Sequence, residues 1–131
     1  MKKFLVPIVC ILSLLFFTAC SENETNASEK AISIATRAVN VADQYLDGTL
    51  DGETAYDLID GYYDDMSYVD SMSQNTDEER KQHTADFCIQ IDVSSLASDV
   101  LGDRIYGDSE SYNNVIESRN NLAEDAGLEK R

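Results

Sequence analysis

The chain is poor in residues that break helices and in residues that often carry catalysis. Its 131 residues include one proline, one histidine and no tryptophan. The proline is Pro7, so nothing beyond it forces a break in a long helix. A Ser-His-Asp site would have to use His83, and no GxSxG motif supplies the nucleophile. A hydrolase using two carboxylates stays open, but spacing alone identifies no such pair. We therefore expect a non-enzymatic protein.

Basic residues are also scarce. The chain has 10 Lys and Arg against 25 Asp and Glu, which gives a formal net charge of −15. Lys2 and Lys3 stand at the start and all acidic residues follow Cys20, so loss of the first 19 residues leaves 8 minus 25, or −17. A domain this acidic repels nucleic acid, so we expect no nucleic-acid partner. Zinc-ligand spacings of the CxxC or HxxxH kind are missing too.

The N-terminus has the pattern of a secretory signal peptide. Lys2 and Lys3 precede an apolar run from Phe4 to Phe17, and the small residues Thr18 and Ala19 end it. A basic start, a short apolar stretch and a small-residue exit are typical of an export signal, and the run is too short for a comfortable membrane span. Residues 1–19 are therefore predicted to be cleaved, which places the remaining chain outside the cytoplasm.

The residues Phe17, Thr18, Ala19 and Cys20 resemble the lipobox of bacterial lipoproteins. The resemblance implies cleavage between Ala19 and Cys20 and fatty acylation of the Cys20 thiol. It also implies a lipid anchor on the extracytoplasmic face of the cell membrane. If the cell has two membranes, Ser21 favours the outer one by the same resemblance. Two or three acyl chains anchor stably, at about 0.8 kcal/mol per buried methylene.

Residues 20–29 are predicted to be the lipidated cysteine and a disordered polar tether, because SENETNASE has no aromatic or branched apolar residue. With Cys20 acylated, Cys88 is the only thiol left after Cys10 departs with the signal, so no internal disulfide forms. The alternative is a secreted glycoprotein with glycans on Asn23 and Asn26, both in NxS/T sequons.

Residues 30–126 are predicted to form an all-α domain, a small antiparallel four-helix bundle. The first helix shows two adjacent apolar rows at helical steps, Ile32, Ala35, Val39, Ala42, Leu46 and Ala31, Ile34, Ala38, Val41, Tyr45. Gly48 suits its end, and Asp51 suits the cap of a second helix. The apolar stripe of that helix is Ala55, Ile59, Tyr62, Met66, Val69. A link this short predicts an antiparallel hairpin.

The third helix is the least obvious from the sequence. Thr76 and Glu79 fit a capping box at its start. Residues 87–93 alternate as in a strand, but no second strand is available to pair with them, so we favour a helix over 77–101. A loop between Gly102 and Gly107 and a last helix from Asp108 or Ser109 complete the bundle. Residues 127–131 are expected to fray.

Two groups of residues are candidate sites. Asp47, Thr49 and Asp51 match the first ligand positions of an EF-hand loop, which makes a calcium-binding module the alternative function. Position twelve of that loop is Leu58 instead of Glu, so turn chemistry explains the residues better. On the second helix, Tyr56 and Tyr63 lie at the edge of the apolar stripe near Asp60 and Asp64. Aromatic residues beside charge are typical of protein interfaces, although they also cover bundle seams. We therefore expect this edge to bind a protein or envelope component.

Overall fold

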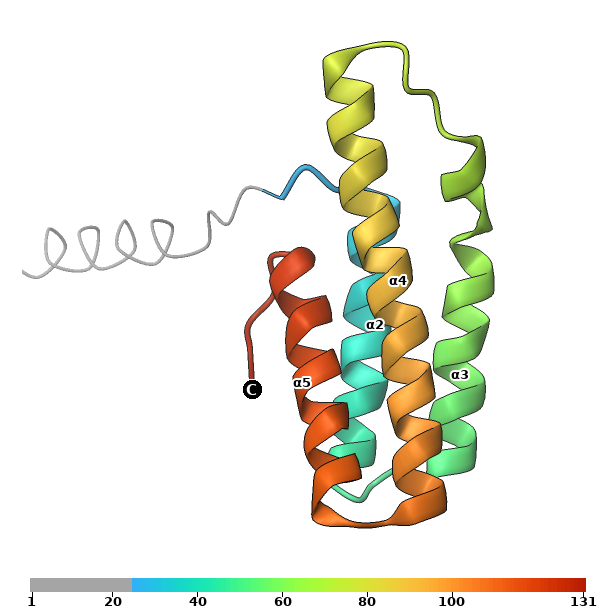
Figure 1. Cartoon of the computed structure of the whole chain (residues 1–131), viewed down its shortest axis with the longest axis vertical. Coiled ribbons are helices and arrows are strands. Elements are labelled where there is room, and N and C mark those ends of the chain that lie inside the picture. The colour runs from blue at the N-terminus through green and yellow to red at the C-terminus, as the bar shows by residue number, and fades with distance from the viewer. Residues whose placement is uncertain (1–24) are drawn as a thin grey trace, which may run out of the picture.

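A computed structural model describes residues 25–131, so the predicted signal peptide, Cys20 and the start of the tether lie outside the described residues. The described part forms four α-helices and one 3-10 helix, η1, in the order α2 (Glu29–Leu46), α3 (Gly52–Asp65), η1 (Ser67–Ser71), α4 (Asp77–Tyr106), α5 (Ser109–Asp125). Successive helices run in opposite directions (Figure 1). The predicted all-α four-helix bundle is confirmed.

Helix α2, like α4, contacts all three of the other α-helices. It packs against α3, α4 and α5, while α3 and α5 lie on either side of α4 and make no close backbone approach to each other. Figure 1 shows α5, α4 and α3 side by side with α2 behind them. The alanines of α2 explain this position, because small side chains let three neighbours approach one helix closely. All four are fully buried: Ala31, Ala35, Ala38, Ala42.

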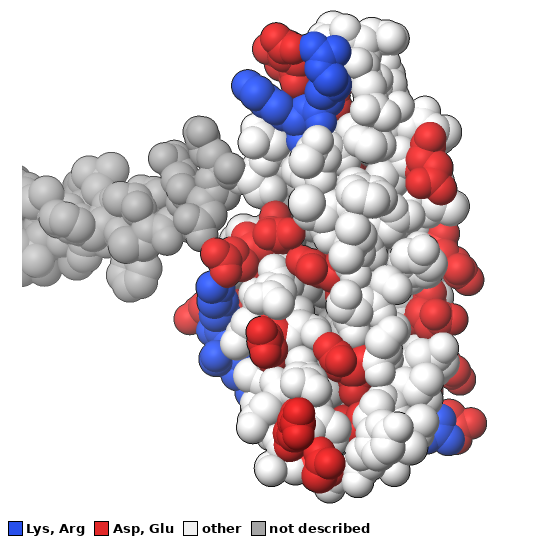
Figure 2. Space-filling view, in the orientation of Figure 1, with Lys and Arg blue, Asp and Glu red and all other residues white. Residues whose placement is uncertain are grey.

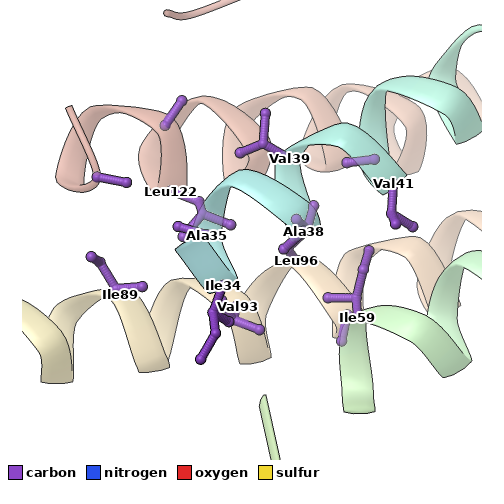
Figure 3. Packing of buried hydrophobic residues seen from close by; sticks show 14 of the residues in the cluster. Ile34, Ala35, Ala38, Val39, Val41, Ile59, Ile89, Val93, Leu96 and Leu122 are labelled. Atoms are coloured by element: carbon purple, nitrogen blue, oxygen red, sulfur yellow. The ribbon is translucent and has the colours of Figure 1, made fainter. Parts of the chain in front are cut away.

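The core is aliphatic (Figure 3). The largest buried apolar side chains come from every element: Ile34, Ile59, Met66, Val69, Ile89, Val93, Leu96, Val100, Val115, Leu122. Each buried side chain of this size stabilises the fold by about 1.5–3 kcal/mol relative to an exposed one. The apolar rows of α2 and α3 predicted from the sequence supply their share of this core.

The helix ends follow the expected chemistry. Asp51 caps α3 and accepts a hydrogen bond from the Thr54 backbone N–H at 2.9 Å. Thr76 and Glu79 form the predicted capping box of α4. Gly107 ends α4 with a φ of 61°, in the left-handed region that favours glycine. These local signals fix the start of α3 and both ends of α4.

The structure corrects four boundaries. Helix α4 continues through Gly102 to Tyr106, so the loop expected after residue 101 is wrong. A helical glycine costs only about 1 kcal/mol, and the buried neighbours Val100 and Asp103 hold this turn in place. Helix α3 ends at Asp65 rather than Val69, and η1 carries Val69 into the core instead.

The third correction concerns the C-terminus. Residues 127–131 were expected to fray, but they fold back along α5. The Arg131 backbone N–H donates to Asn120 Oδ1 at 2.8 Å, and its guanidinium donates to Asp47 at 2.6 Å. Leu128 packs against the core. These contacts hold the last residues on the bundle.

Residues 87–93, which alternate as in a strand, are part of helix α4, and this confirms the helix favoured from the sequence. Its alternation arises because α4 is apolar on two opposite faces. Ile89 and Val93, four residues apart, are fully buried, whereas Phe87 and Ile91 form a second such pair and are exposed. The two pairs are offset by two residues, so together they place an apolar residue at every second position of this helical segment.

A buried aspartate fastens the start of α2. Asp86 of α4 is fully buried and accepts hydrogen bonds from the Ser28 backbone N–H at 2.7 Å and the Ser28 hydroxyl at 2.6 Å. The Tyr68 hydroxyl donates to the same carboxylate at 3.0 Å. Burial is the main cause that raises the pKa of Tyr68 to about 12. Asp86 therefore joins α2, η1 and α4, and it holds the point where the tether enters the bundle.

A similar cluster lies at the other end of α2. Buried Asp103 accepts hydrogen bonds from the Tyr45 hydroxyl at 2.5 Å and the Ser111 hydroxyl at 2.8 Å. Burial, and then the Asp103 carboxylate, raise the pKa of Tyr45 to about 12. Ser28 to Asp86 and Tyr45 to Asp103 are both separations of 58 residues. The constant separation follows from the topology, because α2 and α4 run in the same direction in an up-down bundle.

The tether is shorter than predicted. Residues 20–29 were all assigned to it, but Glu29 begins α2 and Ser28 caps that helix. The Thr25 hydroxyl donates to the backbone carbonyl of Asp125 at the end of α5, at 3.0 Å. The bundle therefore begins close to Thr25, beside the last turn of α5.

Candidate functional site

The candidate site is the face shared by α3 and α4. Three large apolar side chains are exposed there: Tyr63 of α3 at 39 %, Phe87 of α4 at 43 % and Ile91 of α4 at 48 %. They line one shallow groove together with Gln90, Ser94 and Ser95. We call Tyr63, Phe87 and Ile91 the apolar patch. Contiguous exposed apolar side chains of this kind mark interaction surfaces more often than single ones do.

The fold positions the patch through the two faces of α4. Because Ile89 and Val93 point into the core, residues two positions away point outward. Phe87 and Ile91 therefore come to the surface four residues apart, next to each other on one side of the helix. The packing of α3 against α4 then places Tyr63 beside them.

The four residues predicted to bind a partner all lie on α3. Tyr63 belongs to the apolar patch. Asp60 and Asp64 are exposed, and Asp60 precedes Tyr63 by three residues, so it lies on the same side of the helix. Tyr56 is half-buried and packs against the core. The structure thus keeps three of the four at the surface and uses the fourth in packing.

Sequence reasoning missed the contribution of α4. Phe87 and Ile91 are the exposed partners of Tyr63. Their spacing of four residues puts them on one side of a helix, but it does not show whether that side is buried or exposed. The ring of His83 stacks on Phe87, with ring centroids 6.2 Å apart and planes within 6°. His83 thus extends the aromatic edge of the patch.

A second, polar groove runs between α4 and α5. Its lining includes Asp92 and Asp99 of α4 and Glu117 of α5, together with several serines and asparagines. The Ser118 hydroxyl donates a hydrogen bond to Asp99. The groove is acidic, and it adjoins the groove of the apolar patch, because Ser94 and Ser95 line both.

Asp92 is the one strongly perturbed acid of this groove. Burial, and then the negative charge of the nearby Asp125 carboxylate, raise the pKa of Asp92 to about 7. Its Oδ2 atom is buried and accepts no hydrogen bond from any residue that the structure describes. The same two carboxylates lie near Cys88, and burial is the main cause that raises the pKa of its thiol. A thiol with a raised pKa is a weak nucleophile at neutral pH.

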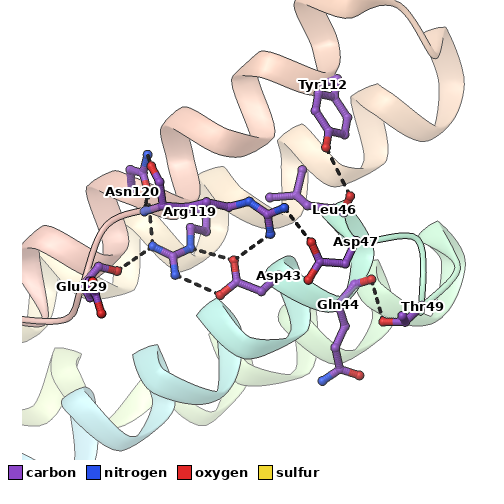
Figure 4. Close-up of polar contacts among 10 residues, drawn as sticks. Asp43, Gln44, Leu46, Asp47, Thr49, Tyr112, Arg119, Asn120 and Glu129 are labelled. Atoms are coloured by element: carbon purple, nitrogen blue, oxygen red, sulfur yellow. Dashed lines mark hydrogen bonds and ion pairs between the residues drawn. The ribbon is translucent and has the colours of Figure 1, made fainter.

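All three alternative calcium residues make other contacts, and Figure 4 shows those of Asp47 and Thr49. Asp51 caps α3, and it also accepts a hydrogen bond from the Thr54 hydroxyl at 2.8 Å. Thr49 donates its hydroxyl to the Gln44 carbonyl at 3.0 Å. Asp47 pairs with Arg131 at 2.6 Å. Across residues 25–131, no three His, Cys, Asp or Glu side chains are grouped so that they could hold a metal ion.

The same region contains a buried arginine. The guanidinium of Arg119 on α5 donates two hydrogen bonds to the Asp43 carboxylate of α2, both at 2.9 Å. A third reaches the Glu129 carbonyl at 2.7 Å. A bidentate pair of this geometry is stronger than an exposed ion pair. Arg119 therefore fastens α2, α5 and the C-terminal residues to one another (Figure 4).

Cys20, the predicted lipidation site, lies outside the described residues, as do Ala19 and the cleavage point. None of the helices within 25–131 combines the length and apolar character needed to cross a bilayer. Comparisons of the chain with protein-family models, with curated proteins and with solved structures find no significant match.

Proposed function

We propose that this protein is a non-enzymatic extracytoplasmic lipoprotein. Lipid on Cys20 holds it to the membrane, and its helical bundle binds another protein or an envelope component. The anchor is supported by the basic start, the apolar run and the lipobox-like residues that end at Cys20. The binding role is supported by one observation above the others. Tyr63, Phe87 and Ile91 are exposed side by side on a domain that is otherwise strongly acidic.

The attachment point lies beside α5, on the side of α4 away from Tyr63 of the apolar patch. Thr25 contacts the end of α5, and only residues 21–24 separate it from Cys20. Five peptide units span at most about 17 Å. The end of α5 therefore stays near the bilayer, while α3, which does not approach α5, lies on the far side of α4. This arrangement turns the α3 side of the bundle away from the lipid.

Metabolic labelling with a radioactive fatty acid tests the anchor. We expect label on the wild-type protein and none on Cys20→Ala, with the variant released from the membrane fraction. Cys88→Ala is the matched control, because Cys88 is the other cysteine that follows the predicted signal. Label that persists in Cys20→Ala, or label that disappears in Cys88→Ala, would contradict the anchor assignment.

Photo-cross-linking in intact cells tests the binding role. A photoreactive amino acid is placed at position 91 in the apolar patch, and at position 58 in a second strain. Leu58 is 40 % exposed and precedes Tyr63 by five residues, so it points to a different side of α3. We expect a discrete cross-linked product from position 91 and none from position 58. Equal yields, or no product at either position, would count against a partner at this face.

A further inference from the structure

The apolar patch is one end of a longer uncharged stripe on α4. Six residues at steps of 4, 3, 4, 3 and 4 follow the outer side of the helix: Phe87, Ile91, Ser94, Ser98, Leu101, Ile105. These steps keep residues on one side of a helix, here over about 27 Å at 1.5 Å per residue. Ile105 at its far end is 65 % exposed. The steps are those of a seam that packs against another helix.

The middle of the stripe has small side chains, and their hydroxyls form hydrogen bonds within the helix. The Ser98 hydroxyl donates to the Ser94 backbone carbonyl at 3.1 Å. Beside them, the Ser95 hydroxyl donates to the Ile91 carbonyl at 3.0 Å. Hydroxyls bonded to their own helix have satisfied their donors, so covering them costs little desolvation. Small residues between two apolar ends let a second helix approach the centre and place its own large side chains there.

Acidic residues border the stripe on both sides. Asp60 and Asp64 are exposed on α3, on one side. Asp99 and Glu117 lie along the groove between α4 and α5, on the other side. Figure 2 shows the result as a largely uncharged band along α4 with acidic side chains to its left and right.

We propose that this stripe binds one amphipathic α-helix of a partner protein, with lysine and arginine flanking that helix's apolar seam. The proposal rests on the function proposed above and adds the chemistry of the partner. An apolar seam takes the apolar face of a helix at i, i+3, i+4 and i+7 spacing. Flanking acids on both sides favour basic side chains on both sides of the incoming helix.

A second copy of this chain fits the stripe less well. A face-to-face pairing of two α4 stripes brings acidic flanks against acidic flanks, because Asp60 and Asp64 stand on one border and Asp99 and Glu117 on the other. Like charges placed opposite each other across an interface oppose binding. Each copy also carries a net charge of −17 after loss of residues 1–19, which adds long-range repulsion. A basic helix avoids both the repulsion between acidic flanks and the repulsion between two negative net charges.

Three synthetic helical peptides of equal length serve as probes. The first has a leucine seam flanked by lysine and arginine. The second keeps the seam and replaces each basic residue with glutamate, and the third keeps the basic residues and scatters the leucines around the helix. Binding is measured by fluorescence anisotropy on the processed chain, residues 20–131, with Cys20→Ser to keep it free of lipid. Circular dichroism checks that each protein is folded.

We expect the first peptide to bind at least about tenfold more tightly than either of the others. Binding should weaken several-fold when salt rises from about 0.05 M to about 0.3 M, because flanking charges contribute and salt screens them. Ile91→Ser and Phe87→Ser should each weaken binding about fivefold or more, as expected for central apolar contacts. Leu58→Ser, the matched exposed control, should change it less than about twofold.

Three results would overturn the proposal. Equal binding of the first and third peptides would mean simple attraction between opposite charges. Absence of binding by the first peptide, together with a cross-linked product at position 91 in cells, would leave the proposed function standing and remove this partner class. Self-association in sedimentation that Ile91→Ser abolishes would assign the stripe to a second copy.

Discussion

On its inner face α4 presents Ile89 and Leu96 to the rest of the bundle with no exposed surface, whereas on its outer face Ile91 and Ile105 are 48 % and 65 % exposed. Both faces carry isoleucine and leucine at helical steps, although Ser94 and Ser98 stand in the middle of the outer face. The neighbours account for the difference. Helices α2, α3 and α5 together cover only one side of α4.

The comparison separates what the fold needs from what it leaves free. Inner-face residues contribute burial, hydrogen bonding and close packing, so the bundle depends on them. The exposed apolar residues of the outer face are not needed to form the core. Apolar residues that the fold does not require are the ones to explain by binding. Substitutions on the two faces therefore have different expected effects.

The largest effect is expected from truncation of the inner face. Leu96→Ala removes a fully buried side chain at the centre of the core. It should lower the free energy of unfolding by about 2–5 kcal/mol, because burial is lost and a cavity remains. Urea denaturation followed by circular dichroism measures this directly. A loss below about 1 kcal/mol would mean that α4 is not at the centre of the core.

The next effect concerns the buried aspartate of the same face. Asp86→Ala leaves the Ser28 N–H, the Ser28 hydroxyl and the Tyr68 hydroxyl without their acceptor. We expect a loss of about 2–3 kcal/mol in urea denaturation, since unsatisfied buried donors cost about 1–3 kcal/mol each before they relax toward water. Tyr68→Phe removes one donor only and should cost about 1 kcal/mol. Equal losses from the two substitutions would show that Asp86 does not hold the start of α2.

The edge of α4 that faces α5 should show a smaller, pH-dependent effect. The pKa of Asp92 is raised to about 7, above its ordinary value of 3.8. The folded state therefore holds this proton more tightly than the unfolded state, and stability falls as the pH rises from about 4 through about 7. Asp92→Asn keeps the side chain neutral. It should raise the free energy of unfolding by about 1 kcal/mol at pH 8, a value reduced for solvent screening, and by almost nothing at pH 4.

Thermal melts of Asp92→Asn and wild type from pH 4 to pH 8 check this prediction. Asp99→Asn is the control, because Asp99 lies in the same groove and accepts a hydrogen bond from Ser118. A constant difference between Asp92→Asn and wild type across the pH range would rule out titration of Asp92 as its cause.

The sequence predicted the helices well because their signals are local. The capping box of Thr76 and Glu79, the Asp51 cap and the apolar rows of α2 are short-range patterns, and each is found as expected. The predicted break at Gly102 failed because a glycine only weakens a helix. Whether the helix continues depends on distant packing, which Val100 and Asp103 provide here.

The sequence predicted only the α3 residues of the candidate site, because exposure on α4 depends on packing between helices that are distant in the sequence. Tyr63, Asp60 and Asp64 could be placed at one edge of α3 from their spacing. Phe87 and Ile91 could not be assigned to the surface, because α4 is apolar on two sides and the sequence does not say which side the other helices cover. The same limit applies to Asp86 and Asp103, whose hydrogen-bond donors lie far away in the sequence.

The most direct test of the difference between the two faces compares Ile89→Ala with Ile91→Ala. Both substitutions make the same chemical change in the same helix, two residues apart, at side chains that are 0 % and 48 % exposed. We predict that Ile89→Ala lowers the free energy of unfolding by about 2–5 kcal/mol, and Ile91→Ala by about 1 kcal/mol or less, because alanine favours the helix. An Ile91→Ala loss of about 2 kcal/mol or more would contradict the account, since Ile91 would then serve the fold rather than a partner.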